Sequence, residues 1–288
     1  MNTNNITFDL NKKREIKFTV KDNKELIEVV IEKDAEDENA KSEYIEDHLT
    51  YGIRETKITV YPADESKNKH VAILIIPGGG FSKESLYYEG ELVAKWLATE
   101  GITGIVYKYR LPKGRNMLPL SDLQLTMEFI RKHANELSIK DDTLGVWGFS
   151  CGGHTAASLA THFTTASKPD FEILFYPVIS MESAFTHLDT RKNLMGDIPT
   201  EDDIRFLSCD EQVKKDTPPT LLILSDDDSR VSPLNSIRYY MALKKKEISA
   251  SMHIFSSGSH GWGFKTEFQY HDIMKEIVLK WVEQEIIE

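Results

Sequence analysis

A serine flanked by two glycines is the first feature of this sequence that could carry chemistry. Gly148 and Gly152 flank Ser150 with the spacing G-x-S-x-G, which is typical of a nucleophile elbow between a strand and a helix. A serine in so tight a turn needs neighbours without side chains, because the turn is strained and the hydroxyl must face an open site. The helix that follows directs its free N–H groups and its positive end at that hydroxyl. We therefore interpret Ser150 as a nucleophile.

A nucleophilic serine needs a base, and the base needs an acid that orients it. Where an elbow of this kind occurs, the acid and then the histidine follow the serine along the chain, in loops after later strands. His260 lies after the last predicted strand, between Gly258 and Gly261, where an imidazole can reach over the sheet. This position distinguishes it among the nine histidines, and His260 is the candidate base.

Three consecutive aspartates compete for the role of the acid. Asp226, Asp227 and Asp228 all follow the predicted strand at residues 221–224. The pattern Asp-x-x-Val, followed by a proline that starts a helix, selects Asp228. Asp227 remains the alternative, and Asp226 is assigned to the turn.

Acyl transfer also needs N–H donors for the charge that develops on the carbonyl oxygen. Three glycines follow the first buried strand directly, and Gly79 or Gly80 would supply one donor of this oxyanion hole. The backbone N–H of Cys151 would supply the second. The loop lacks the Gly-Lys-Ser/Thr ending and the G-x-G-x-x-G spacing of phosphate-binding loops. Because the elbow glycines centre on Ser150, the thiol of Cys151 is interpreted as packing or pocket lining.

Two aromatic residues lie next to these motifs in the sequence. Phe81 follows the glycine loop, and Trp262 lies two residues after His260. We expect both to flank an acyl pocket, where a bulky pair would favour short acyl groups such as acetyl. The alternative is that both are ordinary core aromatics.

Strands and helices alternate along most of the chain, which predicts an α/β fold with a doubly wound, mainly parallel sheet. The run at residues 71–76 is continuously apolar, as expected of a strand buried on both faces. Strands are predicted over residues 14–20, 26–32, 54–62, 71–76, 102–107, 144–148, 171–176, 221–224 and 252–255, and helices over 84–99, 119–136, 233–246 and 266–286, besides the one that follows the elbow.

Residues 1–55 are predicted to be a β extension within the same domain as residues 56–288. A hairpin is expected at 14–32 because Asp22 and Asn23 supply turn chemistry, and the acidic segment 32–47 is expected to be a loop. Residues of about 180–217 interrupt the alternation and are predicted to be a small insertion that covers the pocket like a cap.

From about Thr56 onward, the chain resembles carboxylesterases of the α/β-hydrolase fold, in the acetylesterase or acetyl-xylan-esterase-like branch. The resemblance implies that fold, no cofactor and no metal, esterase activity on small acyl groups, and a triad of Ser150, Asp228 and His260. Residues 1–55 have no counterpart in the family, and cysteine at 151 replaces its usual alanine. The matching segments are Pro77-Gly-Gly-Gly-Phe81, Tyr107-Lys-Tyr-Arg110, Gly148-Phe-Ser-Cys-Gly-Gly-His154, Thr217-Pro-Pro219, Asp227-Asp228 with Asn235-Ser236, and Gly258-Ser-His-Gly261.

Composition excludes several other classes of protein. The 288 residues carry a net charge of −11, which argues against nucleic acid or an anionic membrane as the main partner. No apolar run approaches the ~18 residues that span a bilayer. Cys151 and Cys209 are the only cysteines, so neither a disulfide framework nor a C-x-x-C metal motif is expected. These features predict a reduced, cytoplasmic protein.

The function expected from these residues is hydrolysis of a small-molecule ester through an acyl-enzyme. The resemblance suggests an acetylated sugar as the substrate. The alternatives are an amide hydrolase such as an arylformamidase, with the same triad, and a non-catalytic binding module, which would require a lost triad member. The N-terminal hairpin has a free edge that could pair across a homodimer.

Overall fold

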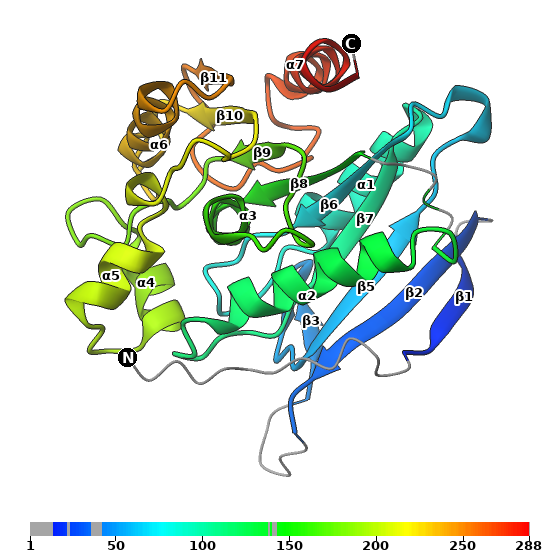
Figure 1. Ribbon diagram of the computed structural model, residues 1–288, viewed down its shortest axis with the longest axis horizontal. Coiled ribbons are helices and arrows are strands. Elements are labelled where there is room, and N and C mark those ends of the chain that lie inside the picture. The colour runs from blue at the N-terminus through cyan, green and yellow to red at the C-terminus, as the bar shows by residue number, and fades with distance from the viewer. Residues whose placement is uncertain (1–13, 22–23, 36–41, 138, 140–142, 288) are drawn as a thin grey trace.

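A nine-stranded sheet runs through the molecule in the order β1-β2-β5-β7-β6-β8-β9-β10-β11 (Figure 1). The computed structural model describes residues 14–21, 24–35, 42–137, 139 and 143–287. The six strands from β7 to β11 pair in parallel, whereas β1, β2, β5 and β7 pair antiparallel. The strands of this sheet are β1 (Ile16–Lys21), β2 (Lys24–Lys33), β5 (Glu55–Tyr61), β6 (Val71–Ile76), β7 (Thr103–Lys108), β8 (Thr143–Phe149), β9 (Glu172–Phe175), β10 (Thr220–Ser225) and β11 (Ala250–Phe255).

Helices cover the sheet on two sides, with α2 on the near side and α1 on the far side in Figure 1. Each side has its own hydrophobic core, because α2, α3 and α6 contribute to one buried cluster and α1 and α7 to another. All six residues of β6 are buried, which is the reason for its continuous apolar run. The helices are α1 (Leu92–Thr99), α2 (Leu118–Lys132), α3 (Cys151–His162), α4 (Leu188–Met195), α5 (Glu201–Leu207), α6 (Leu234–Lys245) and α7 (His271–Val282).

The N-terminal hairpin is present as the antiparallel pair β1–β2, although its predicted turn residues Asp22 and Asn23 lie outside the described residues. Two predicted helices begin later than expected. The helix predicted at 84–99 starts with a loop and a π turn, η2 (Tyr87–Glu91), before α1. The helix predicted at 266–286 begins at His271, because the preceding segment places Phe264 and Phe268 in the core instead.

The prediction of a loop over residues 32–47 is wrong for its C-terminal part. A short hairpin forms there between β3 (Tyr44–Glu46) and β4 (Leu49–Tyr51). Asp47 and His48 connect the two strands with φ of 47° and 64°, the conformation of a two-residue hairpin turn. Charge along this segment therefore did not prevent strand pairing.

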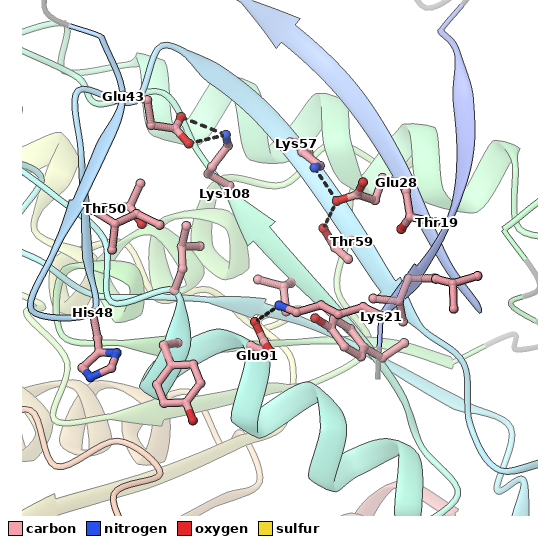
Figure 2. Close-up of a pocket in the computed structure, with 17 residues that line it drawn as sticks. Thr19, Lys21, Glu28, Glu43, His48, Thr50, Lys57, Thr59, Glu91 and Lys108 are labelled. Atoms are coloured by element: carbon pink, nitrogen blue, oxygen red, sulfur yellow. Dashed lines mark hydrogen bonds and ion pairs between the residues drawn. The ribbon is translucent and has the colours of Figure 1, made fainter. Parts of the chain in front are cut away.

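The antiparallel half of the sheet presents one apolar and one polar face. Ile27 and Ile58 point toward the α2 side, whereas Glu28, Lys57 and Thr59 line a groove of about 640 Å³ on the other side (Figure 2). The β3–β4 hairpin and η2 form its walls. The lysines of the groove are paired with carboxylates, as in Lys21–Glu91 at 2.6 Å, Lys57–Glu28, and Lys108–Glu43 at 2.9 Å. Such a face is typical of an antiparallel sheet that is solvated on one side.

A buried ion pair attaches the N-terminal extension to the rest of the sheet. The Arg110 guanidinium, which follows β7, donates to both carboxylate oxygens of Asp122 on α2, at 2.8 and 2.5 Å. Thr56 on β5 also donates to Asp122, at 2.7 Å, and Arg110 also donates to Asp34 after β2, at 3.2 Å. The predicted boundary at residue 55 therefore falls at the start of a strand that pairs with both β2 and β7.

Glu172 is a second buried carboxylate of the fold, at the start of β9. Its Oε1 accepts hydrogen bonds from the Thr220 hydroxyl at 2.7 Å and the Tyr239 hydroxyl at 2.8 Å. Oε2 has no partner among the described residues. Burial raises the pKa of this carboxyl to about 7, and the two hydrogen bonds offset part of that effect.

We predict that Asp122→Ala lowers the free energy of unfolding by about 3 kcal/mol, because it leaves the largely buried Arg110 with fewer acceptors. Urea unfolding at neutral pH measures the change. Asp197→Ala is the control, since Asp197 pairs with Lys192 at the surface and its loss should cost less than about 1 kcal/mol. Equal effects of the two substitutions would contradict the prediction.

Glu172→Gln should change how stability depends on pH. Between the ordinary pKa of 4.5 and about 7, folded wild type binds a proton that the unfolded chain has lost, so its free energy of unfolding falls as pH rises. The variant lacks this titration, and its stability relative to wild type should therefore increase by on the order of 3 kcal/mol between pH 4.5 and 8. Urea unfolding across this range tests the prediction, with the exposed Glu267→Gln as control. Parallel pH profiles of wild type and Glu172→Gln would refute it.

Candidate active site

The G-x-S-x-G segment forms a sharp turn between β8 and α3. Ser150 has φ 53° and ψ −117°, a conformation that side chains rarely adopt, and α3 begins at the next residue. A Cβ at Gly148 would lie 2.4 Å from the carbonyl oxygen of Gly152, and one at Gly152 would lie 2.2 Å from that of Ile76. Both glycines are thus required by close approach of backbone, and they leave Ser150 at the N-terminus of the helix.

The structure brings the three predicted triad residues together in one hydrogen-bonded chain. Ser150 Oγ lies 2.8 Å from His260 Nε2, and His260 Nδ1 lies 2.6 Å from Asp228 Oδ2. With Nδ1–H donating to the carboxylate, Nε2 is free to accept the serine proton. Ser150 and Asp228 are buried, at 7% and 5% exposure, which limits competition from water. This arrangement can perform general-base-assisted nucleophilic attack.

The three aspartates after β10 have different surroundings. Asp228 turns inward, where its other oxygen accepts the backbone N–H groups of Arg230 and Val231 at 2.9 Å each. Asp227, the alternative acid, instead accepts the N–H groups of Ser259 at 2.7 Å and Gly258 at 3.2 Å. Asp227 therefore contacts the backbone of the His260 loop (residues 256–264), whereas Asp228 contacts the imidazole.

The oxyanion loop (residues 77–81) follows β6 and lies against the start of α3. Gly79 has φ 138°, and a Cβ there would lie 2.1 Å from the carbonyl oxygen of Lys83. The backbone of Lys83 therefore leaves no room for a side chain at Gly79. Gly80 has φ 63°, and a Cβ there would lie 3.6 Å from the Thr190 hydroxyl, an ordinary van der Waals contact with the insertion. Cys151 is the first residue of α3, where backbone N–H groups have no acceptor within the helix. The loop contacts the first turn of α3, since a Cβ at Gly152 would lie 2.5 Å from the carbonyl oxygen of Pro77.

The Cys151 thiol is buried between the oxyanion loop and the core. Phe81 N–H donates to Sγ at 3.4 Å, and the Tyr109 hydroxyl lies 3.6 Å from it. Burial raises the pKa of this thiol to about 11, so it is protonated at neutral pH. The thiol therefore packs beneath the loop as a neutral group.

The structure places the two predicted pocket residues in the core. The Phe81 ring is 1% exposed and packs edge-on against Tyr109 and His154. Trp262 is 4% exposed, stacks on Phe268 with ring centroids 4.1 Å apart, and donates its indole N–H to Ser225 at 3.0 Å. Neither side chain presents an open surface, in agreement with the alternative that both are core aromatics.

The insertion at 180–217 contains α4, α5 and a short 3₁₀ turn, η3 (Cys209–Glu211). Its α4 lies against the oxyanion loop, because the Asn193 amide donates to the carbonyl oxygen of Gly80 at 2.8 Å. His187, just before α4, lies 2.8 Å from the Thr190 hydroxyl. Burial lowers the pKa of His187, and the nearby Asp189 carboxylate offsets part of that effect. The insertion thus borders the candidate site.

Sequence reasoning missed three residues that contact these loops. Asn193 binds Gly80 from the insertion, and Glu89 and Tyr176 bond to each other behind the triad, at 2.7 Å. Glu89 falls in a stretch that reads as an ordinary helix, and Tyr176 reads as the last residue of a strand. A charged residue in an otherwise apolar helix face was the one signal that could have indicated Glu89.

The described residues contain neither a metal-binding cluster nor a membrane-spanning helix. No three His, Cys, Asp or Glu side chains there form a group that could hold a metal ion. None of the helices in that part of the chain is long and apolar enough to cross a membrane.

Comparison with known proteins places this geometry among α/β hydrolases. Residues 114–286 match the model of the prolyl oligopeptidase family, Peptidase_S9. The chain is 35% identical over 215 residues to an acetylxylan esterase of Xylanibacter ruminicola, and the aligned segment covers 73% of this chain and 45% of that protein. It is 34% identical over 208 residues to endo-1,4-beta-xylanase B of Butyrivibrio fibrisolvens, and this aligned segment covers 67% of this chain and 32% of that protein. The chain therefore spans less than half the length of either relative.

Among solved structures, the acetyl ester-xyloside bifunctional hydrolase from Caldicellulosiruptor lactoaceticus superposes with a TM-score of 0.75 and 34% identity. The match covers 80% of this chain and 88% of that one. The predicted α/β-hydrolase fold is thereby confirmed, as is the resemblance to esterases of the acetylxylan type.

We predict different effects of the two candidate acids on catalysis. Asp228→Asn should lower kcat for an ester by on the order of 10³–10⁴, because the imidazole loses the carboxylate that orients it and stabilises its charge. Asp227→Asn should lower kcat less than about tenfold, since Asp227 contacts backbone N–H groups alone. Steady-state kinetics measures both, with circular dichroism as a check of folding. A larger effect at Asp227 would reverse the assignment.

Proposed function

This chain belongs to the prolyl oligopeptidase family of α/β hydrolases, and we propose that it is a serine carboxylester hydrolase that acts on short acyl esters. The observation that carries the proposal is the hydrogen-bonded chain from Ser150 through His260 to Asp228. The esterase names of its relatives support the same reaction class. Because all three groups of a triad are present and in contact, a non-catalytic binding module has no support.

The proposed reaction proceeds in two steps. Ser150 Oγ attacks the ester carbonyl while His260 Nε2 takes its proton, and Asp228 stabilises the resulting imidazolium. The backbone N–H groups of Gly80 and Cys151 donate to the oxyanion, with Gly79 placing the loop. The C–O bond then breaks, and His260 returns the proton to the leaving alcohol. Water repeats the sequence on the acyl-enzyme and releases the carboxylic acid and free Ser150.

We propose an acetylated sugar as the substrate. The proposal is supported by the names of two relatives, an acetylxylan esterase and an acetyl ester-xyloside bifunctional hydrolase. The core position of Phe81 and Trp262 assigns neither to the acyl pocket, so a preference for acetyl would have to arise from the residues around Gly80 and α4. A cytoplasmic location and a homodimer formed through the N-terminal hairpin stay predictions.

Ester hydrolysis with matched variants tests the proposal. We expect activity on p-nitrophenyl esters that falls as the acyl chain lengthens from two to twelve carbons, and release of acetate from acetylated xylo-oligosaccharides. Ser150→Ala should lower kcat by at least about 10⁴, because the nucleophile is removed. Unchanged activity in this variant would contradict the role of Ser150. Cleavage of formyl amides in preference to acetyl esters would favour the arylformamidase alternative instead.

A further inference from the structure

Glu89 is a buried carboxylate that the proposed reaction does not use. It belongs to the π turn η2, is 4% exposed, and lies behind the triad. Oε2 accepts the backbone N–H of Gly78 at 2.8 Å, and Oε1 accepts the Tyr176 hydroxyl at 2.7 Å. Burial raises the pKa of Glu89, and these two hydrogen bonds offset part of that effect. A group that is costly to bury is therefore held between two donors from different loops.

Tyr176 connects Glu89 to the candidate base, His260. Tyr176 directly follows β9, and its ring packs against the His260 imidazole in a T-shaped arrangement with centroids 4.8 Å apart. The same Tyr176 hydroxyl accepts the backbone N–H of Gly263 at 2.9 Å. Gly263 also packs directly against η2, because a Cβ at Gly263 would lie 2.9 Å from Glu89 Cγ. Glu89 and Tyr176 together therefore support the His260 loop.

Gly78 connects Glu89 to the candidate nucleophile, Ser150, and to the oxyanion loop. A Cβ at Gly78 would lie 2.8 Å from Ser150 Cβ, so the backbone of Gly78 is in direct contact with the serine. The next two residues of the loop are Gly79 and Gly80. The hydrogen bond from Gly78 to Glu89 therefore holds the start of the oxyanion loop at a defined distance from Ser150.

We propose that Glu89 is a positioning residue that holds the oxyanion loop and the His260 loop in the correct places around Ser150. It touches neither the substrate nor the reacting atoms, and acts through Gly78 and Tyr176. A carboxylate suits this role because both of its oxygens accept, whereas an amide of the same size has one acceptor and one donor. The inference rests on the proposed serine-hydrolase function.

Glu89→Gln is the decisive substitution. The glutamine amide cannot accept from Gly78 and Tyr176 at once, so at least one of these two hydrogen bonds is lost while the side-chain volume is kept. We expect kcat for an acetyl ester to fall by about 100-fold with KM within about twofold of wild type, since small displacements of catalytic groups affect the transition state most. The rate at which a fluorophosphonate probe labels Ser150 should fall in parallel.

Glu172→Gln is the matched control. Glu172 is also a buried glutamate that accepts a tyrosine hydroxyl, from Tyr239 at 2.8 Å, but its partners belong to β10 and α6. The same chemical change there should leave kcat, KM and the labelling rate within about twofold of wild type. Equal losses of activity in both variants, or a loss at Glu89 that matches the fraction unfolded in urea titrations, would overturn the inference.

A double variant tests whether Glu89 acts through Tyr176. Tyr176→Phe removes the hydroxyl, and the glutamine amide of Glu89→Gln can then occupy that space while its oxygen accepts from Gly78. Tyr176→Phe also removes the acceptor of the Gly263 N–H, so it lowers activity by itself. Because Glu89 and Tyr176 belong to one network, we expect the double variant to lose less activity than the product of the two single losses. Losses that multiply would show independent roles and contradict the inference.

The labelling rate separates this inference from the proposed function. Wild type that reacts with the probe but hydrolyses no ester would contradict the proposed substrate class, and Glu89 would still be judged by its labelling rate. Equal labelling rates of wild type and Glu89→Gln would overturn the role of Glu89, whatever the substrate.

Discussion

The candidate site depends on a steric contact in which no side chain fits between β8, α3 and the loop after β6. A Cβ at Gly152 would lie 2.2 Å from the carbonyl oxygen of Ile76 and 2.5 Å from that of Pro77. This contact brings the N-terminus of α3 beside the oxyanion loop and leaves Ser150 with positive φ. The loop and the helix can approach each other this closely because Gly152 has no Cβ. The cost is the strained backbone of Ser150, which the surrounding sheet and helix must maintain.

Buried carboxylates hold much of the structure around this contact. Glu84 accepts the N–H of Tyr109 at 2.9 Å, Glu89 accepts from Gly78 and Tyr176, and Glu172 accepts from two hydroxyls at the base of β9. Burial raises the pKa of all three, which shows that each is held against its solvation preference. Glu84 and Glu172 each leave one oxygen without a partner among the described residues, whereas both oxygens of Glu89 are bonded. The best-satisfied of the three is therefore the one that adjoins the triad.

The two regions that interrupt the α/β alternation are attached by side chains rather than by apolar packing alone. Asp34 binds the extension to Arg110 of the Arg110–Asp122 pair, and Asn193 binds the insertion to Gly80. The extension thereby continues the sheet, while the insertion borders the catalytic loops. This difference in attachment explains why the insertion, and not the extension, contributes groups near the triad.

Sequence alone determined the parts of this protein that depend on local pattern. The apolar runs predicted the buried strands, the glycine spacing selected Ser150, and the order of loops selected His260, because burial and tight turns restrict residue types at neighbouring positions. The sequence does not decide whether Asp227 or Asp228 faces the imidazole. The two neighbours have the same side chain, and only the fold determines which way each side chain points. The core positions of Phe81 and Trp262, and the meeting of Glu89 with Gly78 and Tyr176, were decided by tertiary structure alone. These contacts join residues as many as 87 positions apart, and no local pattern encodes which distant side chains a fold brings within hydrogen-bonding distance.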